Sequence, residues 1–314
     1  MPRNDEAKKQ IAIEVEGLSK SFDGKLVVRN LSMRVKRGQI YGFLGPNGSG
    51  KTTTLRMLCG LLTPDSGRGS CLGYDIRRDS EQIKRHVGYM TQRFSLYQDL
   101  SIVENLEFVA RVYGLPDPAG EARRAIARLG LQGREHQLAG TLSGGWKQRL
   151  ALGACILPKP ELLLLDEPTA GVDPKARREF WNEIHKLAAD GMTVLVSTHY
   201  MDEAERCHEI AYIAYGVLLA QGSIDEVIAK SQLQTYTVSG ADLDGLADRL
   251  LGRKGIDMVA PFGTSLHVAG RDARALEEAI APFKGDPQLN WVPSPPSLED
   301  VFIDLMARSQ DNFQ

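Results

Sequence analysis

A glycine-rich segment that ends in lysine and threonine has the spacing of a phosphate-binding loop. The glycines allow successive N–H groups to converge on an anion, and a following helix adds its dipole. A lysine at this spacing places its charge on the β- and γ-phosphates, and a threonine hydroxyl is a hard oxygen ligand for Mg²⁺. With Thr53 after it, the segment predicts a site for a nucleoside triphosphate and Mg²⁺. Its residues, in the pattern G-x-x-x-x-G-K-T, are Gly45, Pro46, Asn47, Gly48, Ser49, Gly50, Lys51 and Thr52.

The residues on either side of the loop supply the elements that must position it. Residues 39–44 are short, apolar and aromatic, which is typical of a buried strand, and residues 53–59 can start a helix. A strand, the loop and a helix in this order are the context that the motif needs. The alternative is a chance glycine-rich turn before a structural lysine, and these flanks disfavour it.

Polar side chains also follow two later predicted strands. Asp166 and Glu167 come directly after four leucines, and a short apolar run of this kind is typical of a parallel strand covered on both faces. His199 ends the next predicted strand, at residues 192–197. Because ligands bind at the carboxyl ends of strands in open α/β sheets, we expect these three side chains at the ligand edge. For the acidic pair the alternatives are loop solvation and helix capping.

A second segment has the chemistry of an anion site. Ser143, Gly144 and Gly145 precede an apolar stretch at residues 150–157. A serine and two glycines at the start of a helix offer free N–H groups, a hydroxyl and the helix dipole to an anion. One domain does not need two such sites for one nucleotide. We therefore expect this segment to contact the phosphate bound by a second copy of the chain.

Composition indicates an ordinary soluble protein. The 314 residues are 25% charged and 42% hydrophobic, with a formal net charge of −2, so no strong global field favours nucleic acid. No window approaches the ~18 apolar residues of a membrane span, and residues 1–10 lack a signal-peptide core, so we expect a cytoplasmic protein. The four cysteines form no C-x-x-C pair, which disfavours zinc clusters and redox motifs.

The pattern of predicted elements indicates an α/β fold with two domains, residues 1–228 and 229–314. Antiparallel strands are expected early, a strand at residues 70–74, and an inserted helical subdomain at about 93–160 within a mixed α/β core. After residue 229 the order strand, helix, strand, strand, helix, strand resembles a small α+β ferredoxin-like module, with its last strand at 289–292.

These motifs occur in the order found in the ATP-binding subunits of ABC transporters, which the sequence resembles over residues 11–228. The resemblance implies the P-loop NTPase fold of ABC ATPases and ATP as the nucleotide. It makes Phe22, before a predicted turn, the base-stacking aromatic; packing on its own hairpin is the alternative. The matching segments are residues 45–52 with Walker A, Gln92 with the Q-loop glutamine, 142–149 with the signature, 162–166 with Walker B, Glu167 with the catalytic glutamate, 170–173 with the D-loop and His199 with the switch histidine.

The resemblance also assigns roles. We expect Glu167 to be the general base that polarises the attacking water, and Asp166 to hold Mg²⁺, directly or through water. His199 would bond the γ-phosphate and orient the water, and Gln92 would ligate Mg²⁺ through its amide oxygen. Asp173 is a helix N-cap, a contact across a dimer, or both. The plain alternatives are a surface histidine and a loop glutamine.

Three features resemble the ABC-2 export branch: Trp146, where the commonest signature has glutamine, and residues 89–97 and 296–302. This implies a homodimeric ATPase subunit that works with a separate transmembrane permease on the cytoplasmic face of the inner membrane. Phe94, Leu96, Tyr97 and the helix at residues 102–113 are expected to form the groove that receives the permease; the alternative is that they are core residues of the helical insert.

Two other functions stay open. One is a non-transport ABC ATPase that acts on ribosomes or DNA, although such proteins usually carry tandem ATPase copies, long coiled coils or zinc clusters, and the sequence has none of these. The other is an importer ATPase with a regulatory C-terminal domain. The C-terminal module does not resemble the β-rich barrel of the sugar-importer ATPases.

Overall fold

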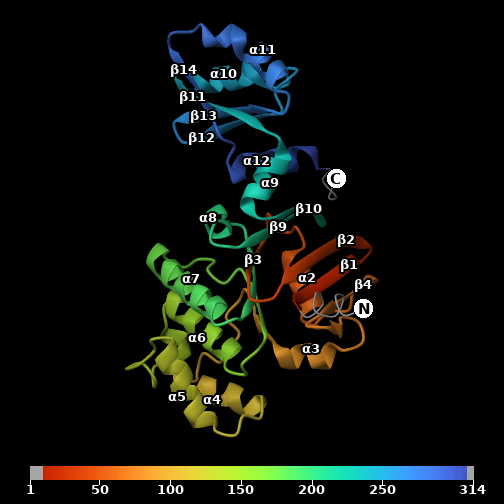
Figure 1. The fold of residues 1–314 in the computed structure, drawn as a ribbon. Helices are drawn as coiled ribbons and strands as arrows, with labels where there is room; N and C mark the ends of the chain where they lie inside the picture. The colour runs from red at the N-terminus through yellow and green to blue at the C-terminus, as the bar shows by residue number, and fades with distance from the viewer. Residues whose placement is uncertain (1–9, 310–314) are drawn as a thin grey trace. The chain divides into compact units, whose positions relative to one another are not determined.

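The computed structural model describes residues 10–309 (Figure 1). The chain forms two compact units that divide between Leu218 and Leu219, within strand β10, whereas the predicted domain boundary lies after residue 228. Within the described residues, none of the helices has the length and apolar character needed to span a membrane.

A six-stranded sheet forms the centre of the first unit. Its strand order is β10-β9-β3-β8-β7-β6, and the neighbours from β9 to β6 pair in parallel. Their carboxyl ends therefore lie at one edge of the sheet. The strands are β3 (Ile40–Leu44), β6 (Val87–Met90), β7 (Leu162–Asp166), β8 (Thr193–Thr198), β9 (Glu209–Ala214) and β10 (Val217–Gly222).

The two faces of this sheet are buried against different layers, because successive side chains of a strand point to opposite faces. Leu163 and Val194 face a cluster built from the helices α4 to α7. Leu164 and Leu195 face the helix α2 and a second, antiparallel sheet. The helices are α2 (Lys51–Leu58), α3 (Ser80–His86), α4 (Ile102–Val112), α5 (Pro118–Arg128), α6 (Gly144–Ile156), α7 (Pro174–Ala189) and α8 (Met201–Ala204).

The antiparallel sheet has the order β2-β1-β4-β5, with β1 (Ile11–Phe22), β2 (Lys25–Lys36), β4 (Ser66–Cys71) and β5 (Tyr74–Asp75). The single strand predicted at residues 70–74 is wrong. Leu72 and Gly73 both have positive φ, 55° and 88°, and they form a two-residue turn between β4 and β5. Positive φ at both central residues is what a tight hairpin needs, because its twist then matches that of the strands.

The second unit contains a four-stranded antiparallel sheet of order β12-β13-β11-β14, the ferredoxin-like arrangement that the sequence predicted. Val238, Leu266 and Val268 of the sheet pack with apolar residues of α10 and α11. The last strand, predicted at 289–292, continues for two more residues to Ser294. It does not stop before Pro293, because β14 is an edge strand and a proline can be accommodated there. The elements are α9 (Ile224–Ser231), β11 (Gln234–Gly240), α10 (Leu243–Leu250), β12 (Met258–Phe262), β13 (Ser265–Gly270), α11 (Ala273–Lys284), β14 (Leu289–Ser294) and α12 (Leu298–Arg308).

Candidate functional site

The glycine-rich loop joins β3 to α2 and can be built only with glycine at two points. A Cβ on Gly45 would lie 2.0 Å from the carbonyl oxygen of Ile213, and one on Gly50, which has a φ of 102°, would lie 2.8 Å from that of Val27. Since Lys51 begins α2, the first N–H groups of this helix have no intrahelical acceptor. The loop therefore directs free donors toward the carboxyl edge of the parallel strands.

A buried hydroxyl in the loop supports an anion at this position. Ser49 is 2% exposed, and its Oγ has no hydrogen-bond partner among the described residues. A buried polar atom without a partner is costly, and phosphate oxygens are acceptors that would satisfy it. Asn47 and Gly48, at the tip of the loop, are exposed. The loop thus has both the donors and the access that a nucleotide phosphate needs.

Lys51 is a buried cation with three oxygen contacts. Its Nζ donates to the carbonyl oxygens of Gly45 at 2.8 Å and Pro46 at 3.1 Å, and lies 3.2 Å from Oε1 of Glu167. Burial lowers the pKa of Lys51, and the carboxylates of Glu167 and Asp166 oppose that shift. The ammonium is therefore held by groups that phosphate oxygens can replace.

Asp166, at the end of β7, accepts hydrogen bonds from three hydroxyls. Oδ1 accepts from Thr52 at 3.1 Å and from Ser197 at 2.7 Å, and Oδ2 accepts from Tyr89 at 3.4 Å. Burial raises the pKa of Tyr89 to about 12. Ser197 and Tyr89 were not predicted as site residues from the sequence. The signal for Ser197 was its place two residues before His199, on a strand predicted to neighbour that of Asp166.

The oxygens of Thr52 and Asp166 fit a Mg²⁺ ion, because both are hard ligands and they lie side by side at the loop. In the described part of the chain, no group of three or more His, Cys, Asp or Glu side chains could hold a metal by itself. A site of few protein ligands is the usual case for Mg²⁺, which is bound by one or two carboxylates together with substrate phosphates.

Glu167 is where the predicted side chains converge. Its Oε2 accepts from Nε2 of Gln92 at 2.9 Å and lies 3.7 Å from Nδ1 of His199, while Oε1 faces Lys51. Glu167 is 8% exposed, and Nδ1 of His199 is buried without a hydrogen-bond partner in the described structure. The fold thus brings together residues from the α2 start and from the ends of β6, β7 and β8.

Phe22 lies at the end of β1, beside the turn to β2, and is 44% exposed. The Lys20 ammonium lies 5.7 Å from the centre of its ring. The side chain is therefore a partly accessible aromatic surface, and its contact with Lys20 lies within its own hairpin.

The second predicted anion site, Ser143 with Gly144 and Gly145, lies at the start of α6, on the face of the sheet opposite to α2. Ser143 is the N-cap residue, but its side chain accepts no capping hydrogen bond, and Ser143 and Gly144 are exposed. Gly145 packs closely on α7, since a Cβ there would lie 2.6 Å from Cβ of Ala176. The donors of this segment therefore face outward.

Two arginines enclose the unusual tryptophan of this segment. The guanidinium carbons of Arg134 and Arg149 lie 4.7 and 5.0 Å from the centre of a Trp146 ring, distances at which cation–π attraction operates. Arg149 also donates to the carbonyl oxygen of Leu129 at 3.0 Å and pairs with Glu179 on α7. Trp146 thus ties the start of α6 to the surrounding helical layer.

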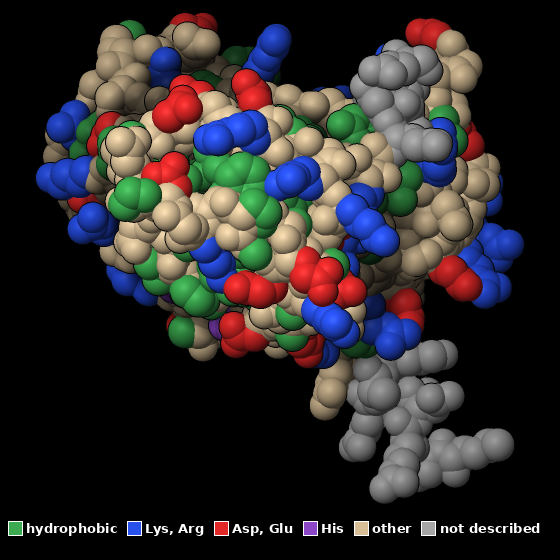
Figure 2. Space-filling view, turned by 90° about the horizontal axis from the view of Figure 1, so that it is seen from above, with side chains coloured by type: hydrophobic (Ala, Val, Ile, Leu, Met, Phe, Trp, Pro, Cys, Tyr) green, Lys and Arg blue, Asp and Glu red, His purple; other side chains and the backbone are tan. Residues whose placement is uncertain are grey.

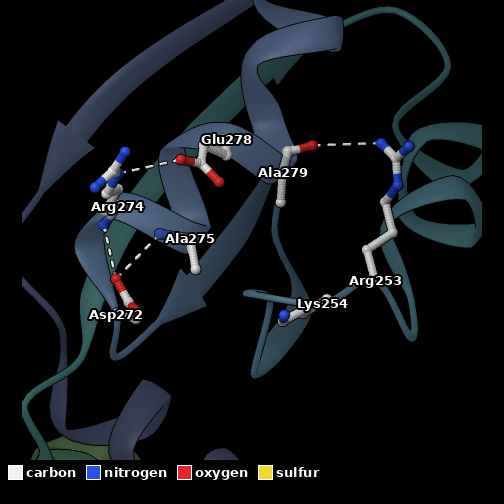
Figure 3. A pocket seen from close by; sticks show the side chains of 7 residues that line it. All are labelled: Arg253, Lys254, Asp272, Arg274, Ala275, Glu278 and Ala279. Carbon is white, nitrogen blue, oxygen red and sulfur yellow. Dashed lines mark hydrogen bonds and ion pairs between the residues drawn. The ribbon is translucent and has the colours of Figure 1, made fainter.

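Two cavities outside the glycine-rich loop differ in size and in the charge of their lining. One of about 160 Å³ lies between the segment after β6, α4 and α6, and is lined by side chains that include Phe94, Leu96 and Tyr113. Another of about 610 Å³ lies in the second unit beside α11 (Figure 3). There Arg274 pairs with Glu278 at 3.2 Å, and Arg253 donates to the carbonyl of Ala279 at 3.3 Å. The second cavity is a charged surface depression in which Arg274 and Glu278 form an ion pair and Asp272 accepts from backbone N–H groups.

Comparison with known proteins gives a consistent result. The family described as ABC transporter matches residues 28–170. A "Probable multidrug ABC transporter ATP-binding protein YbhF" of Escherichia coli is 44% identical over 224 residues, which are 71% of this chain and 39% of that protein. The "Nod factor export ATP-binding protein I" of Ralstonia nicotianae is 37% identical over 305 residues, 94% of each chain.

Solved structures match the nucleotide-binding part of the fold. A structure described as an ATP binding subunit of an ABC transporter shares 30% identity, with a TM-score of 0.63, and covers 70% of this chain and 92% of that one. A protein of Clostridium perfringens, described as part of an ABC transporter complex, shares 28% identity with a TM-score of 0.65 over the same shares of the two chains.

Proposed function

Because the chain belongs to the ABC transporter family of ATP-binding proteins, we propose that it binds and hydrolyses ATP to power an ABC-2 type exporter. The observation that carries this proposal is the convergence of Lys51, Gln92 and His199 on Glu167, directly beside Asp166. The unpaired Ser49 hydroxyl in the loop supplies the adjoining phosphate site.

Lys51 and Glu167 would exchange partners when ATP binds. The Lys51 ammonium, paired with Glu167 in the structure, would turn to the β- and γ-phosphates, where the free N–H groups of the loop also donate. Glu167 would then be available as the base for the attacking water. Mg²⁺, held by Thr52, Asp166 and Gln92, would neutralise phosphate charge.

His199 and Gln92 would complete the site. The unpartnered Nδ1 of His199 lies close enough to Glu167 for both side chains to contact one water and the γ-phosphate. Gln92 donates to Glu167 and lies between β6 and the first helix of the helical layer, α4. Its side-chain position would therefore depend on what occupies the site. Phe22 would stack on the base from the antiparallel sheet, where its ring is accessible.

A dimer would complete each site with the signature of the other copy. The exposed Ser143 and Gly144 lie on the face of the sheet opposite to α2, which favours contact with a partner's nucleotide over the chain's own. Two chains related by twofold symmetry would enclose two ATP molecules. Hydrolysis would remove the contacts that favour the closed state, and the dimer would reopen.

Transport requires a permease, and we propose that a cytoplasmic helix of the permease docks at the cavity beside Gln92. The exposed hydrophobic side chains on and near α4 support this position: Tyr97, Phe108, Val112 and Tyr113. The chain would act at the cytoplasmic face of the inner membrane through this partner. The relative named as a Nod factor export protein, which aligns over 94% of the chain, favours an exporter over an importer.

An ATPase that acts on nucleic acid is the second candidate. On the face seen in Figure 2, basic and acidic side chains are mixed and hydrophobic side chains lie between them. With a net charge of −2, this pattern offers little attraction for a phosphate backbone. A nuclease-sensitive association in cell extracts would favour this alternative over a membrane transporter.

The experiment that tests the proposal compares Glu167→Gln with the parent chain. The variant should bind ATP·Mg²⁺, lose roughly 10²- to 10⁴-fold in hydrolysis, and accumulate as an ATP-dependent dimer in size-exclusion chromatography. Glu161→Gln, at the other end of β7, changes an exposed carboxylate paired with Arg37 and should behave as the parent. Hydrolysis by Glu167→Gln at the parent rate would refute the assigned base, and a variant that stays monomeric with ATP would refute closure by nucleotide alone.

A further inference from the structure

We propose that Ser197 is a positioning residue that holds both Asp166 and Glu167 in place for hydrolysis, an inference that rests on the proposed function. Ser197 is fully buried on β8, directly opposite Asp166 in the β7–β8 register. Its Oγ donates to Oδ1 of Asp166 at 2.7 Å and accepts from the N–H of Glu167 at 3.0 Å. Its carbonyl oxygen accepts from the same N–H at 3.1 Å.

The backbone of Glu167 needs such support. Its φ is 47°, in the left-handed region that non-glycine residues seldom adopt, and it precedes Pro168, a position that favours extended backbone. A residue in this conformation persists only where its surroundings fix it. Ser197 supplies two acceptors to the Glu167 N–H and thereby fixes the turn that sends the carboxylate toward Lys51 and Gln92.

The same hydroxyl relates three parts of the site. It fixes Oδ1 of Asp166, which also contacts the Thr52 hydroxyl, and it belongs to the strand that delivers His199 two residues later. Without it, the N–H of Glu167 keeps only the carbonyl of residue 197, and Asp166 loses its shortest hydrogen bond in the site. The phosphate loop and Lys51 keep their own contacts.

The test is the kinetics of Ser197→Ala in the full chain. We expect kcat for ATP hydrolysis to fall on the order of 10- to 100-fold, because small displacements of catalytic groups have effects of this size. At saturating Mg²⁺, KM for ATP should change little, since the loop that holds the phosphates is intact. Ser197→Thr restores a hydroxyl at the same position and should recover most of the lost kcat.

A matched control lies on the same strand. Thr193, at the start of β8, is also buried, and its hydroxyl accepts from the N–H of Gly38 at 3.0 Å. Thr193→Val removes this hydroxyl far from the carboxyl edge and should leave kcat unchanged. Hydrogen exchange of the Glu167 amide, measured without nucleotide, should be faster in Ser197→Ala and unchanged in Thr193→Val.

Parent-like kcat and amide exchange in Ser197→Ala would overturn the inference. An equal loss of kcat in Thr193→Val would also overturn it, because the effect would then be a general loss of stability. Failure of the proposed function can be distinguished from failure of this inference. If the proposed function is wrong, the parent itself hydrolyses no ATP, while the amide-exchange comparison still reports on the contacts of Ser197.

Discussion

At the scale of single residues, the site is organised around a buried lysine. Lys51 and Glu167 are 4% and 8% exposed, and a buried charge is tolerated only when it is paired and hydrogen-bonded. The partners of Lys51 are two loop carbonyls and the Glu167 carboxylate, all at the position where phosphates would bind. The ion pair therefore competes with the ligand, and the ammonium is already in place when the ligand arrives.

We predict that Lys51→Met weakens ATP binding by roughly 10- to 150-fold, because hydrogen bonds to a charged group are worth about 1.5–3 kcal/mol. A fluorescent ATP analogue measures the change by titration. Lys186→Met, which changes a lysine 72% exposed on α7 and paired with Glu183, is a control that should bind as the parent does. Equal affinity in Lys51→Met and the parent would contradict the role of this lysine.

A pH dependence follows from the same residue. Burial lowers the pKa of Lys51 from the ordinary 10.5, and bound phosphate would raise it again. ATP affinity should therefore be complete below the lowered pKa and fall as pH rises from that value toward 10.5. Titrations of the parent across the alkaline range should show this fall, and Lys51→Met should lack it. An equal fall in both proteins would assign the effect to other groups.

At the scale of elements, helix starts do much of the positioning. Asp173 caps α7, where its carboxylate accepts from the N–H groups of Lys175 at 3.1 Å and Ala176 at 3.0 Å. Ser101 and Glu104 form a reciprocal capping box at the start of α4. These caps fix the residues at which α4 and α7 begin. The cap of α7 thereby fixes the end of the loop that follows Glu167.

We predict that Asp173→Ala lowers the free energy of unfolding by about 1 kcal/mol, the usual worth of an N-cap, and that Asp173→Ser restores it. Urea denaturation measures both. The same pair separates capping from a contact across the dimer: in a Glu167→Gln background, a dimer weakened by Asp173→Ser despite normal stability would show a second role. Normal dimerisation would leave Asp173 as a cap alone.

At the scale of the whole molecule, the candidate nucleotide site adjoins the surface that we propose for docking of the permease. The site lies at the carboxyl edge of the parallel strands, while a hydrophobic surface lies on and near α4. Exposed apolar patches of this kind mark interaction sites in soluble proteins. In the proposed function, this hydrophobic surface is where the permease would dock.

We predict that Val112→Asp, at a side chain 66% exposed on α4, reduces the membrane-bound fraction of the protein in cells that contain its permease. A buried charge at an apolar interface is costly, so docking should weaken. Leu61→Asp changes a comparably exposed leucine, 55% exposed, after α2 and should leave the fraction unchanged. Equal membrane association of the two variants would refute α4 as the docking surface.

The sequence by itself determined the fold class and the candidate groups, because the features that encode them are local. The phosphate loop is contiguous, the buried strands are short apolar runs, and the ferredoxin-like order follows from alternating periodicities. Helix α9 was missed although Ser223 and Glu226 form a capping box that the sequence displays. The roles of the site residues stay predictions until the variants are measured.

Only the tertiary structure decided how the groups meet. Ser197 and Tyr89 contact Asp166 because strands far apart in the chain pair in one register, and no local pattern encodes that register. The continuation of β14 through Pro293 depends likewise on the pairing of this strand with β11. Pairing between distant segments is set by burial of the whole sheet, so it becomes visible only when the chain is folded.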